Sequence, residues 1–307
     1  NVLYINCLDQ AATLADVVGD TDKAESYRET AATAREAWNE FFIDPDTGKT
    51  KNTKGEIQDT QASYATPLRF HVVSDENLGK VLENYNATIA EASGEDSDGM
   101  PIVPYTLTTG FNATGNLLNA LSDYGLNDTA YKLFESTDYA SWLYPVTQGA
   151  TSIWERWNGY TNELGFNGNN SMNSFNHYSL GAVYEWMVAY QLGIKSDETQ
   201  PGYQYFILQP TVGGDFTEAK GSYDSVYGII KSGWTASDGV MTSYDVTVPA
   251  NTSATLYLPV SGEVTACDGV TVTGAATHNA VETQQIELVA GTYHFEVVDG
   301  NVTVTAA

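Results

Sequence analysis

The segment from Trp142 to Trp186 concentrates the side chains best suited to chemistry on a sugar. It holds four of the chain's six tryptophans, and a single carboxylate, Glu155, lies between Trp154 and Trp157. Aromatic rings stack on the apolar faces of a pyranose, while charged and amide groups bind its hydroxyls. This combination predicts a carbohydrate site.

Glu155 could act as a general base. Residues Ile153 to Trp157 carry β-branched and aromatic side chains, so we expect a short extended segment. Side chains alternate in such a segment, which would place Glu155 beside Trp157 and put Trp154 and Arg156 on the other face. Glu155 would then not pair with Arg156, and partial desolvation makes a carboxylate a stronger base. A packed strand with one distant ion pair explains the same residues equally well.

Five segments, in this order, resemble the bacterial α-L-rhamnosidases of glycoside hydrolase family 78. They are D-T-Q (Asp59 to Gln61), L-T-T-G-F (Leu107 to Phe111), S-W-L-Y-P-V (Ser141 to Val146), G-A-T-S-I-W-E-R-W (Gly149 to Trp157) and N-H-Y-S-L-G-A-V (Asn176 to Val183). Downstream, G-Y-Q-Y-F-I-L-Q-P, from Gly202 to Pro210, is similar to that family's C-terminal β-domain. No single segment is specific, but their shared order is.

The resemblance implies an (α/α)6 barrel and inverting hydrolysis of terminal α-L-rhamnose. It implies that Glu155 activates the attacking water and that His177 hydrogen-bonds the rhamnose. A histidine ring can both donate to and accept from a hydroxyl, although a lone histidine near a helix start is more often structural. The other residues expected near the sugar are Trp157, Arg156, Trp154 and Asn176.

The resemblance also exposes a gap. Inverting hydrolysis needs two carboxyl groups about 6.5–9.5 Å apart, one as acid and one as base. The family's acid lies upstream, in an Asp-Glu-Arg segment followed by Gly-Trp and Gly-Asp, and residues 1–307 contain no such segment. We therefore expect the chain to carry the base without the acid. If the chain were active alone, the acid would be among Asp59, Asp98, Asp138, Glu163 and Glu185.

The elements that position these residues begin with helices. Apolar spacing predicts helices over about residues 3–18, 21–42, 58–71, 75–92, 111–124, 127–136 and 177–192, with an acidic turn at residues 94–99. The last is apolar nearly all round, so we expect it to be buried on every side. Seven helices are roughly half of those in six helical hairpins, and Asn1 already lies inside a helical pattern. We expect a partial (α/α)6 barrel that lacks its N-terminal half.

The character of the sequence changes after Gly193. A polar linker over residues 196–202 leads into alternating apolar and polar residues, with turn residues every 8 to 12 positions. This pattern is typical of an antiparallel β-sandwich. We predict a glycosidase domain over residues 1–195 and a β-sandwich over residues 196–307, whose simplest role is to pack against and stabilise the helical domain.

The composition of the chain limits the classes of partner that it can bind. The formal charge of −26, with only 13 Lys and Arg, argues against nucleic acid and anionic membranes. No apolar run reaches the ~18 residues of a membrane span, and no signal peptide is recognisable. Cys7 and Cys267 fall in different predicted domains and make no disulfide framework. Compartment and oligomeric state stay open.

The function that we predict is hydrolysis of rhamnose-containing glycosides, without metal or cofactor. The histidines outside the central segment, His71, His278 and His294, are too scattered for a metal site. Two alternatives remain: a non-catalytic carbohydrate-binding protein, or an inactive fragment of the enzyme.

Overall fold

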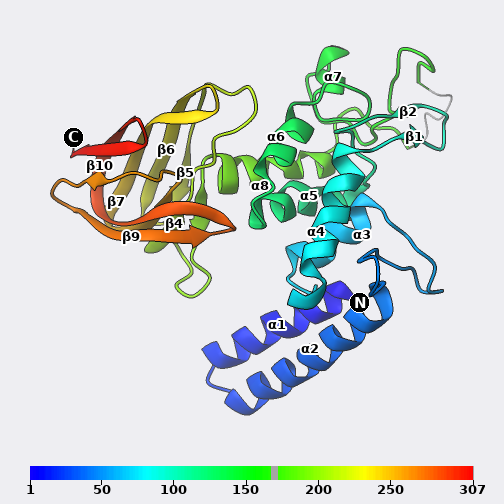
Figure 1. Cartoon of the computed structure of the whole chain (residues 1–307), viewed down its shortest axis with the longest axis horizontal. Helices are drawn as coiled ribbons and strands as arrows, with labels where there is room; N and C mark the ends of the chain where they lie inside the picture. Colours follow the sequence, from blue (N-terminus) through cyan, green and yellow to red (C-terminus); the bar gives the residue numbers. More distant parts are fainter. Residues whose placement is uncertain (167–171, 307) are drawn as a thin grey trace. The chain divides into compact units, whose positions relative to one another are not determined.

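The computed structural model describes residues 1–166 and 172–306 (Figure 1). Contacts divide the chain into two units, residues 1–121 with 132–180 and residues 122–131 with 181–307. The first unit is largely helical and the second is rich in strands. Among the described residues, no helix combines the length and apolarity needed to cross a membrane.

Six of the predicted helices are present within a few residues of their expected bounds. They are α1 (Val2–Val17), α2 (Thr21–Phe42), α3 (Gln61–Arg69), α4 (Asp75–Ala90), α5 (Phe111–Asp123) and α6 (Asn127–Glu135). A short helix that the sequence did not predict, α7, covers Tyr144–Thr147. A two-stranded ribbon, β1 (Gly94–Glu95) with β2 (Pro101–Ile102), lies at the predicted acidic turn.

Helices α1 and α2 form the predicted hairpin. The Asp20 carboxylate accepts the backbone N–H of Lys23 and so caps α2. The buried face is made of small side chains and one large ring: Ile5, Ala12, Ala15, Ala24, Ala31 and Trp38. On the other side of α1, Leu3, Leu14 and Val17 are 59%, 66% and 78% exposed.

Helix α3 begins later than the apolar spacing predicted. Thr60 caps it, because the Thr60 hydroxyl accepts from the Ser63 N–H while the Ser63 hydroxyl takes the Thr60 N–H. Asp59, one residue earlier, has a positive φ of 45°, which is incompatible with a helix. The cap therefore sets the helix start.

The helix predicted from His177 to Leu192 is three short pieces. They are a 3-10 turn, η1 (Ser179–Ala182), then α8 (Val183–Trp186), then a π-helix, η2 (Met187–Gln191). His177 stays outside the helix because its own N–H donates to the Ile153 carbonyl at 2.8 Å. The expectation of burial on every side is also wrong, since Tyr184 is 66% exposed.

The second unit contains one branched nine-stranded sheet. Its strands are β3 (Ile194–Ser196), β4 (Tyr205–Leu208), β5 (Glu218–Ser225), β6 (Gly228–Ser237), β7 (Val240–Leu258), β8 (Val264–Thr265), β9 (Val270–His278), β10 (Val281–Val298) and β11 (Asn301–Ala306). Most pairings are antiparallel, but β4 with β7 and β8 with β11 are parallel.

The long strands β7 and β10 join two layers around one core. Residues 243–247 of β7 pair with both β6 and the end of β10, while residues 253–256 pair with both β4 and the start of β10. A bulge between Val289 and Gly291 marks the change. Inward side chains from both halves share the core, among them Phe206, Tyr244, Leu256, Ile286 and Phe295.

Candidate functional site

The segment Ile153–Trp157 is irregular and not the short extended segment with alternating side chains that we predicted. Two backbone hydrogen bonds hold it, from Glu155 N–H to Ser174 O and from His177 N–H to Ile153 O, both 2.8 Å long. A turn follows at once, closed by Gly159 N–H donating to Arg156 O at 3.2 Å. Because the backbone turns here, side chains do not alternate between two faces. The consecutive residues 155–158 all line one pocket.

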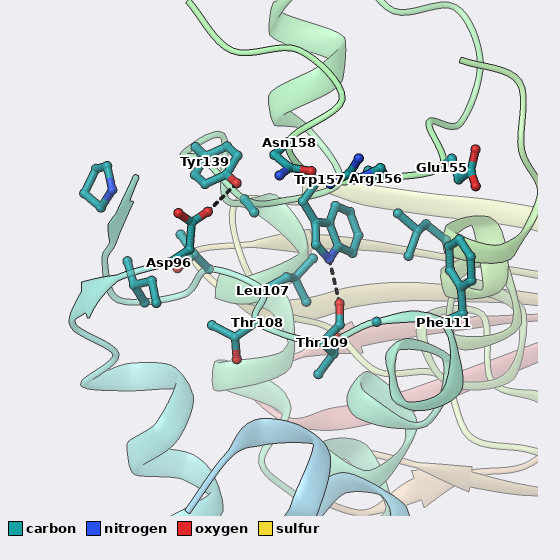
Figure 2. Close-up of a pocket in the computed structure, with 16 residues that line it drawn as sticks. Asp96, Leu107, Thr108, Thr109, Phe111, Tyr139, Glu155, Arg156, Trp157 and Asn158 are labelled. Carbon is teal, nitrogen blue, oxygen red and sulfur yellow. Dashed lines mark hydrogen bonds between the residues drawn. The ribbon is translucent and has the colours of Figure 1, made fainter. Parts of the chain in front are cut away.

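This pocket has a volume of about 490 Å³, within the range of small-molecule sites. Its walls come from the β1–β2 ribbon, residues 106–111 before and at the start of α5, residues 139–140, and residues 155–158 (Figure 2). The pocket lies within the first unit. A carbohydrate ring of ordinary size would fit this volume.

Glu155 is a half-buried carboxylate with a fixed orientation. One of its oxygens, Oε2, accepts the backbone N–H of Ser174 at 2.7 Å. Glu155 and Arg156 line the same pocket, and no ion pair joins them among the described residues. The carboxylate is therefore available to a water molecule or a hydroxyl.

Trp157 supplies the aromatic wall. Its indole N–H donates to the Thr109 carbonyl at 2.7 Å, and its ring meets Trp142 edge to face, with centroids 5.9 Å apart. Trp142 is itself anchored, because its indole N–H donates to Leu180 O at 2.8 Å. The apolar face of Trp157 is thus held in place before any ligand binds.

The other predicted site residues lie around the pocket. Trp154 is buried and lines a neighbouring, more apolar pocket of about 330 Å³ that shares Trp157 as a wall. His177 stacks on Phe111 with ring centroids 4.9 Å apart, and Phe111 lines the main pocket. Asn176 is exposed. The structure therefore gathers Glu155, Arg156 and Trp157 at the main pocket and places the remaining three outside its wall.

The D-T-Q segment positions the pocket wall. Gln61 is almost fully buried, and its side chain donates to Thr106 O at 2.8 Å and to Thr88 O at 3.2 Å. Its side-chain oxygen accepts the backbone N–H of Thr108 at 2.9 Å. These bonds tie α3 and α4 to the strip of residues that carries Thr109.

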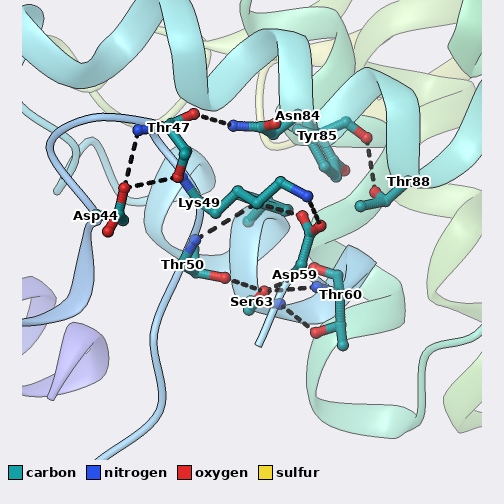
Figure 3. A network of polar contacts seen from close by, with 11 residues as sticks. Asp44, Thr47, Lys49, Thr50, Asp59, Thr60, Ser63, Asn84, Tyr85 and Thr88 are labelled. Carbon is teal, nitrogen blue, oxygen red and sulfur yellow. Dashed lines mark hydrogen bonds and ion pairs between the residues drawn. The ribbon is translucent and has the colours of Figure 1, made fainter. Parts of the chain in front are cut away.

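Asp59, the first residue of the same segment, lies in a separate polar network (Figure 3). Its carboxylate binds Lys49 Nζ at 2.5 Å and accepts the Tyr64 hydroxyl at 2.6 Å. Both oxygens are thus already engaged, and Asp59 does not line the pocket. Asp98, Asp138, Glu163 and Glu185, the other acids that we considered, are likewise absent from the described pocket wall.

Two residues that line the pocket, Asp96 and Tyr139, were not predicted from the sequence. The Tyr139 hydroxyl donates to Asp96 Oδ2 at 2.6 Å, and the backbone N–H groups of Asp98 and Met100 donate to Oδ1 at 2.9 Å each. Burial alone would raise the pKa of Asp96, but these hydrogen bonds together lower it. The sequence Asp-Ser-Asp-Gly at residues 96–99 was the available signal, because an aspartate there folds its side chain onto the following N–H groups.

Within the described residues, no group of three or more His, Cys, Asp or Glu side chains could hold a metal ion. The chemistry that the pocket itself offers is that of two hydrogen-bonded carboxylates, Glu155 and Asp96, with a guanidinium and an indole face. This set suits a neutral, polyhydroxylated ligand.

Two family models match the chain. One describes the bacterial α-L-rhamnosidase six-hairpin glycosidase domain and matches residues 1–190; the other describes the bacterial α-L-rhamnosidase C-terminal domain and matches residues 193–272. The chain belongs to the bacterial α-L-rhamnosidase family. The first match spans the helices, and the second spans strands β3 to β8.

Individual α-L-rhamnosidases extend the match. The protein from Formosa agariphila is 32% identical over 291 residues, which cover 93% of this chain and 29% of that protein. The crystal structure of the Streptomyces avermitilis α-L-rhamnosidase complexed with L-rhamnose matches with a TM-score of 0.75 and 31% identity, over 94% of this chain and 26% of that one. The crystal structure of the native Aspergillus terreus α-L-rhamnosidase matches with a TM-score of 0.78 and 25% identity, over 96% of this chain and 30% of that one. The chain thus spans less than a third of the length of these rhamnosidases.

Proposed function

We propose that this chain is part of a longer α-L-rhamnosidase, which hydrolyses terminal α-L-rhamnose from rhamnosides. In this proposal residues 1–195 form part of the glycosidase domain and residues 196–307 form the C-terminal β-domain. Membership of the family and the similarity to a rhamnosidase complexed with L-rhamnose support the substrate class. The exposed apolar side chains of α1, Leu3, Leu14 and Val17, would be covered by neighbouring helices in a complete barrel.

The observation that carries the proposal is the position of Glu155. It is a half-buried carboxylate that lines the pocket next to Trp157, and Ser174 N–H fixes its orientation. As general base, Glu155 takes a proton from a water molecule while that water bonds to the anomeric carbon. The glycosidic bond breaks on the opposite face of the ring, which inverts the configuration and releases β-L-rhamnose.

The leaving oxygen needs a proton from a second carboxyl group. Asp96 is the other carboxylate in the described pocket wall, but its lowered pKa keeps it ionised near neutral pH, which makes it a poor acid. The proposal therefore places the general acid on a part of the enzyme outside residues 1–307.

The first experiment replaces Glu155 by Gln in the full-length enzyme and measures hydrolysis of an aryl α-L-rhamnoside. We expect kcat to fall by about 10²–10⁴, the usual contribution of a general base, with rhamnose binding retained. Glu163→Gln, at an exposed residue, is the matched control. Unchanged turnover in Glu155→Gln, or α-L-rhamnose as the first product in a time-resolved NMR spectrum, would contradict the proposed mechanism.

A second function, sugar binding without hydrolysis, is favoured by the absence of a protonated acid from the described pocket wall. Complementation separates the two. The chain alone should bind L-rhamnose but leave rhamnosides intact, and adding the upstream half of a related barrel should restore turnover. Binding without turnover in both samples would select the binding function.

A further inference from the structure

Asp96 and Tyr139 form a pair at the end of the pocket away from Glu155. Figure 2 shows Asp96 and Glu155 on opposite sides, with Trp157 between them. Asp96 comes from the turn of the β1–β2 ribbon, and Tyr139 lies 43 residues further along the chain. Both side chains line the pocket.

The hydrogen bonds of this pair leave only acceptors facing the pocket. An ionised carboxylate has about four lone-pair sites, and three of those on Asp96 are taken by Asp98 N–H, Met100 N–H and the Tyr139 hydroxyl. The remaining site is on Oδ2. The Tyr139 hydroxyl donates its only proton to Asp96, so towards the pocket its oxygen can only accept hydrogen bonds. A ligand must donate hydrogen bonds to be recognised here.

The positive charge of Arg156 further restricts the class of ligand that can bind here. Arg156 lines the same pocket and makes no ion pair with a described residue. A cationic donor would be repelled by this guanidinium, whereas a sugar hydroxyl can donate to Asp96 and accept from an arginine. A neutral, polyhydroxylated group fits both.

The ribbon is also held to the residues that follow Trp157. The Asn158 side-chain amide donates to the Asp98 carboxylate, so the turn that carries Asp96 is tied to the chain beside the aromatic wall. The distance between the acceptor pair and the indole face is therefore fixed by the fold. This preorganisation reduces the entropic cost of binding.

We infer that Asp96 and Tyr139 recognise the leaving group of the substrate and select one that carries hydroxyls. The inference rests on the proposed function, because in an inverting hydrolase the leaving group lies on the face of the sugar opposite the base. With Glu155 as base, that face is turned toward the end of the pocket where Asp96 lies. The preferred substrates are then rhamnosyl-sugars rather than rhamnosides with an apolar aglycone.

The test compares kcat/KM for an α-L-rhamnosyl-hexose with that for an aryl α-L-rhamnoside in the full-length enzyme. Asp96→Asn keeps Oδ1 for the two backbone N–H groups and replaces the ionised acceptor by an amide. We expect it to shift the ratio of the two kcat/KM values against the disaccharide by about tenfold or more, the effect of losing a hydrogen bond to a charged group. Tyr139→Phe should shift the ratio in the same direction by less.

Glu95→Gln, at an exposed residue of the same ribbon, is the matched control and should leave the ratio unchanged. An unchanged ratio in Asp96→Asn would overturn the inference. If the unmodified enzyme cleaves neither substrate, the proposed function fails, and calorimetric binding of the disaccharide then decides the role of Asp96. Binding at least tenfold weaker in Asp96→Asn would support a hydroxyl-recognition role, and equal affinity would overturn it.

Discussion

The side-chain oxygen of Gln61 accepts the backbone N–H of Thr108 at 2.9 Å. The carbonyl of the next residue, Thr109, accepts the indole N–H of Trp157. The buried side-chain amide of Gln61, on α3, therefore fixes the position of the residues that form this wall of the pocket. The same side chain donates to Thr88 O and Thr106 O, so its hydrogen-bonding capacity is used in three directions. Support of this kind is what holds a binding site rigid before the ligand arrives.

Gln61→Met tests this support, because Met has a similar size but no polar atoms that can replace the amide. The variant leaves the Thr88 and Thr106 carbonyls and the Thr108 N–H without their Gln61 partner, so we expect the free energy of unfolding to fall by about 2–4 kcal/mol. Urea denaturation measures this value. The exposed Gln58 offers the control, since Gln58→Met should change stability by no more than about 0.5 kcal/mol. Equal losses in both variants would show that Gln61 has no special role.

We expect His278 to make the stability of the β-rich unit depend on pH. Its ring stacks on Tyr257 at 4.0 Å, and Nδ1 bonds to Gln209 Oε1 at 2.7 Å. Burial, and then the charge of Lys195, lower the pKa of His278, while Asp123 opposes them. The unfolded chain, with a histidine pKa of about 6.5, then takes up a proton more readily than the folded one.

Stability contributed by His278 is therefore complete above about pH 6.5 and falls as the pH drops through that value toward the lower folded pKa. Denaturation curves between pH 8 and pH 5 should show this fall, and His278→Gln should remove it. The exposed His294 provides the comparison, because His294→Gln should keep the fall. A pH profile that is the same in His278→Gln and the unmodified protein would refute this assignment.

Gly193 ends η2 in a conformation that only glycine fits. Its φ is +75°, and an added Cβ would lie 2.1 Å from the carbonyl carbon of Gln209. Gly239 has nearly the same φ, +76°, but open space around it. Gly239→Ala should cost about 1–2 kcal/mol for backbone strain, and Gly193→Ala about 1–3 kcal/mol more for the clash. Thermal unfolding compares the two, and similar melting temperatures would contradict the steric argument.

Apolar spacing was sufficient to predict the presence of helices α1 to α6, because each buries one apolar face, but it did not predict where α3 begins. It was not sufficient after His177. There, the His177 N–H donates to the Ile153 carbonyl, and the helical pieces that follow end in a π-helix, where the Leu192 N–H donates to Met187 O. Hydrogen bonds between distant segments decide such details, and periodicity does not contain them.

The site could be predicted only in part, because hydrogen bonds between distant segments also decide how its residues are arranged. Glu155 and Trp157 could be recognised from residue type, and both line the pocket. Their side-by-side arrangement with Arg156 could not, because it depends on the turn closed by Gly159 and not on strand alternation. Asp96 and Tyr139 meet only through the tertiary fold.

The alternating pattern after Gly193 predicted the strands of the second unit but not their connections. The bulge between Val289 and Gly291 lets β10 serve both layers, and β4 joins β7 in parallel. Both features depend on register, which turn residues and alternation leave undetermined where strands are long.

The β1–β2 ribbon has a consequence for protein engineering. Gly94 pairs with Ile102, so the two ends of the ribbon lie side by side at the distance of paired strands. The loop between them is consequently an exchangeable cassette: another hairpin closes the same gap and leaves helices α4 and α5 uninterrupted. Libraries confined to residues 95–99 would vary the end of the pocket that carries Asp96 and keep Met100, whose side chain is buried.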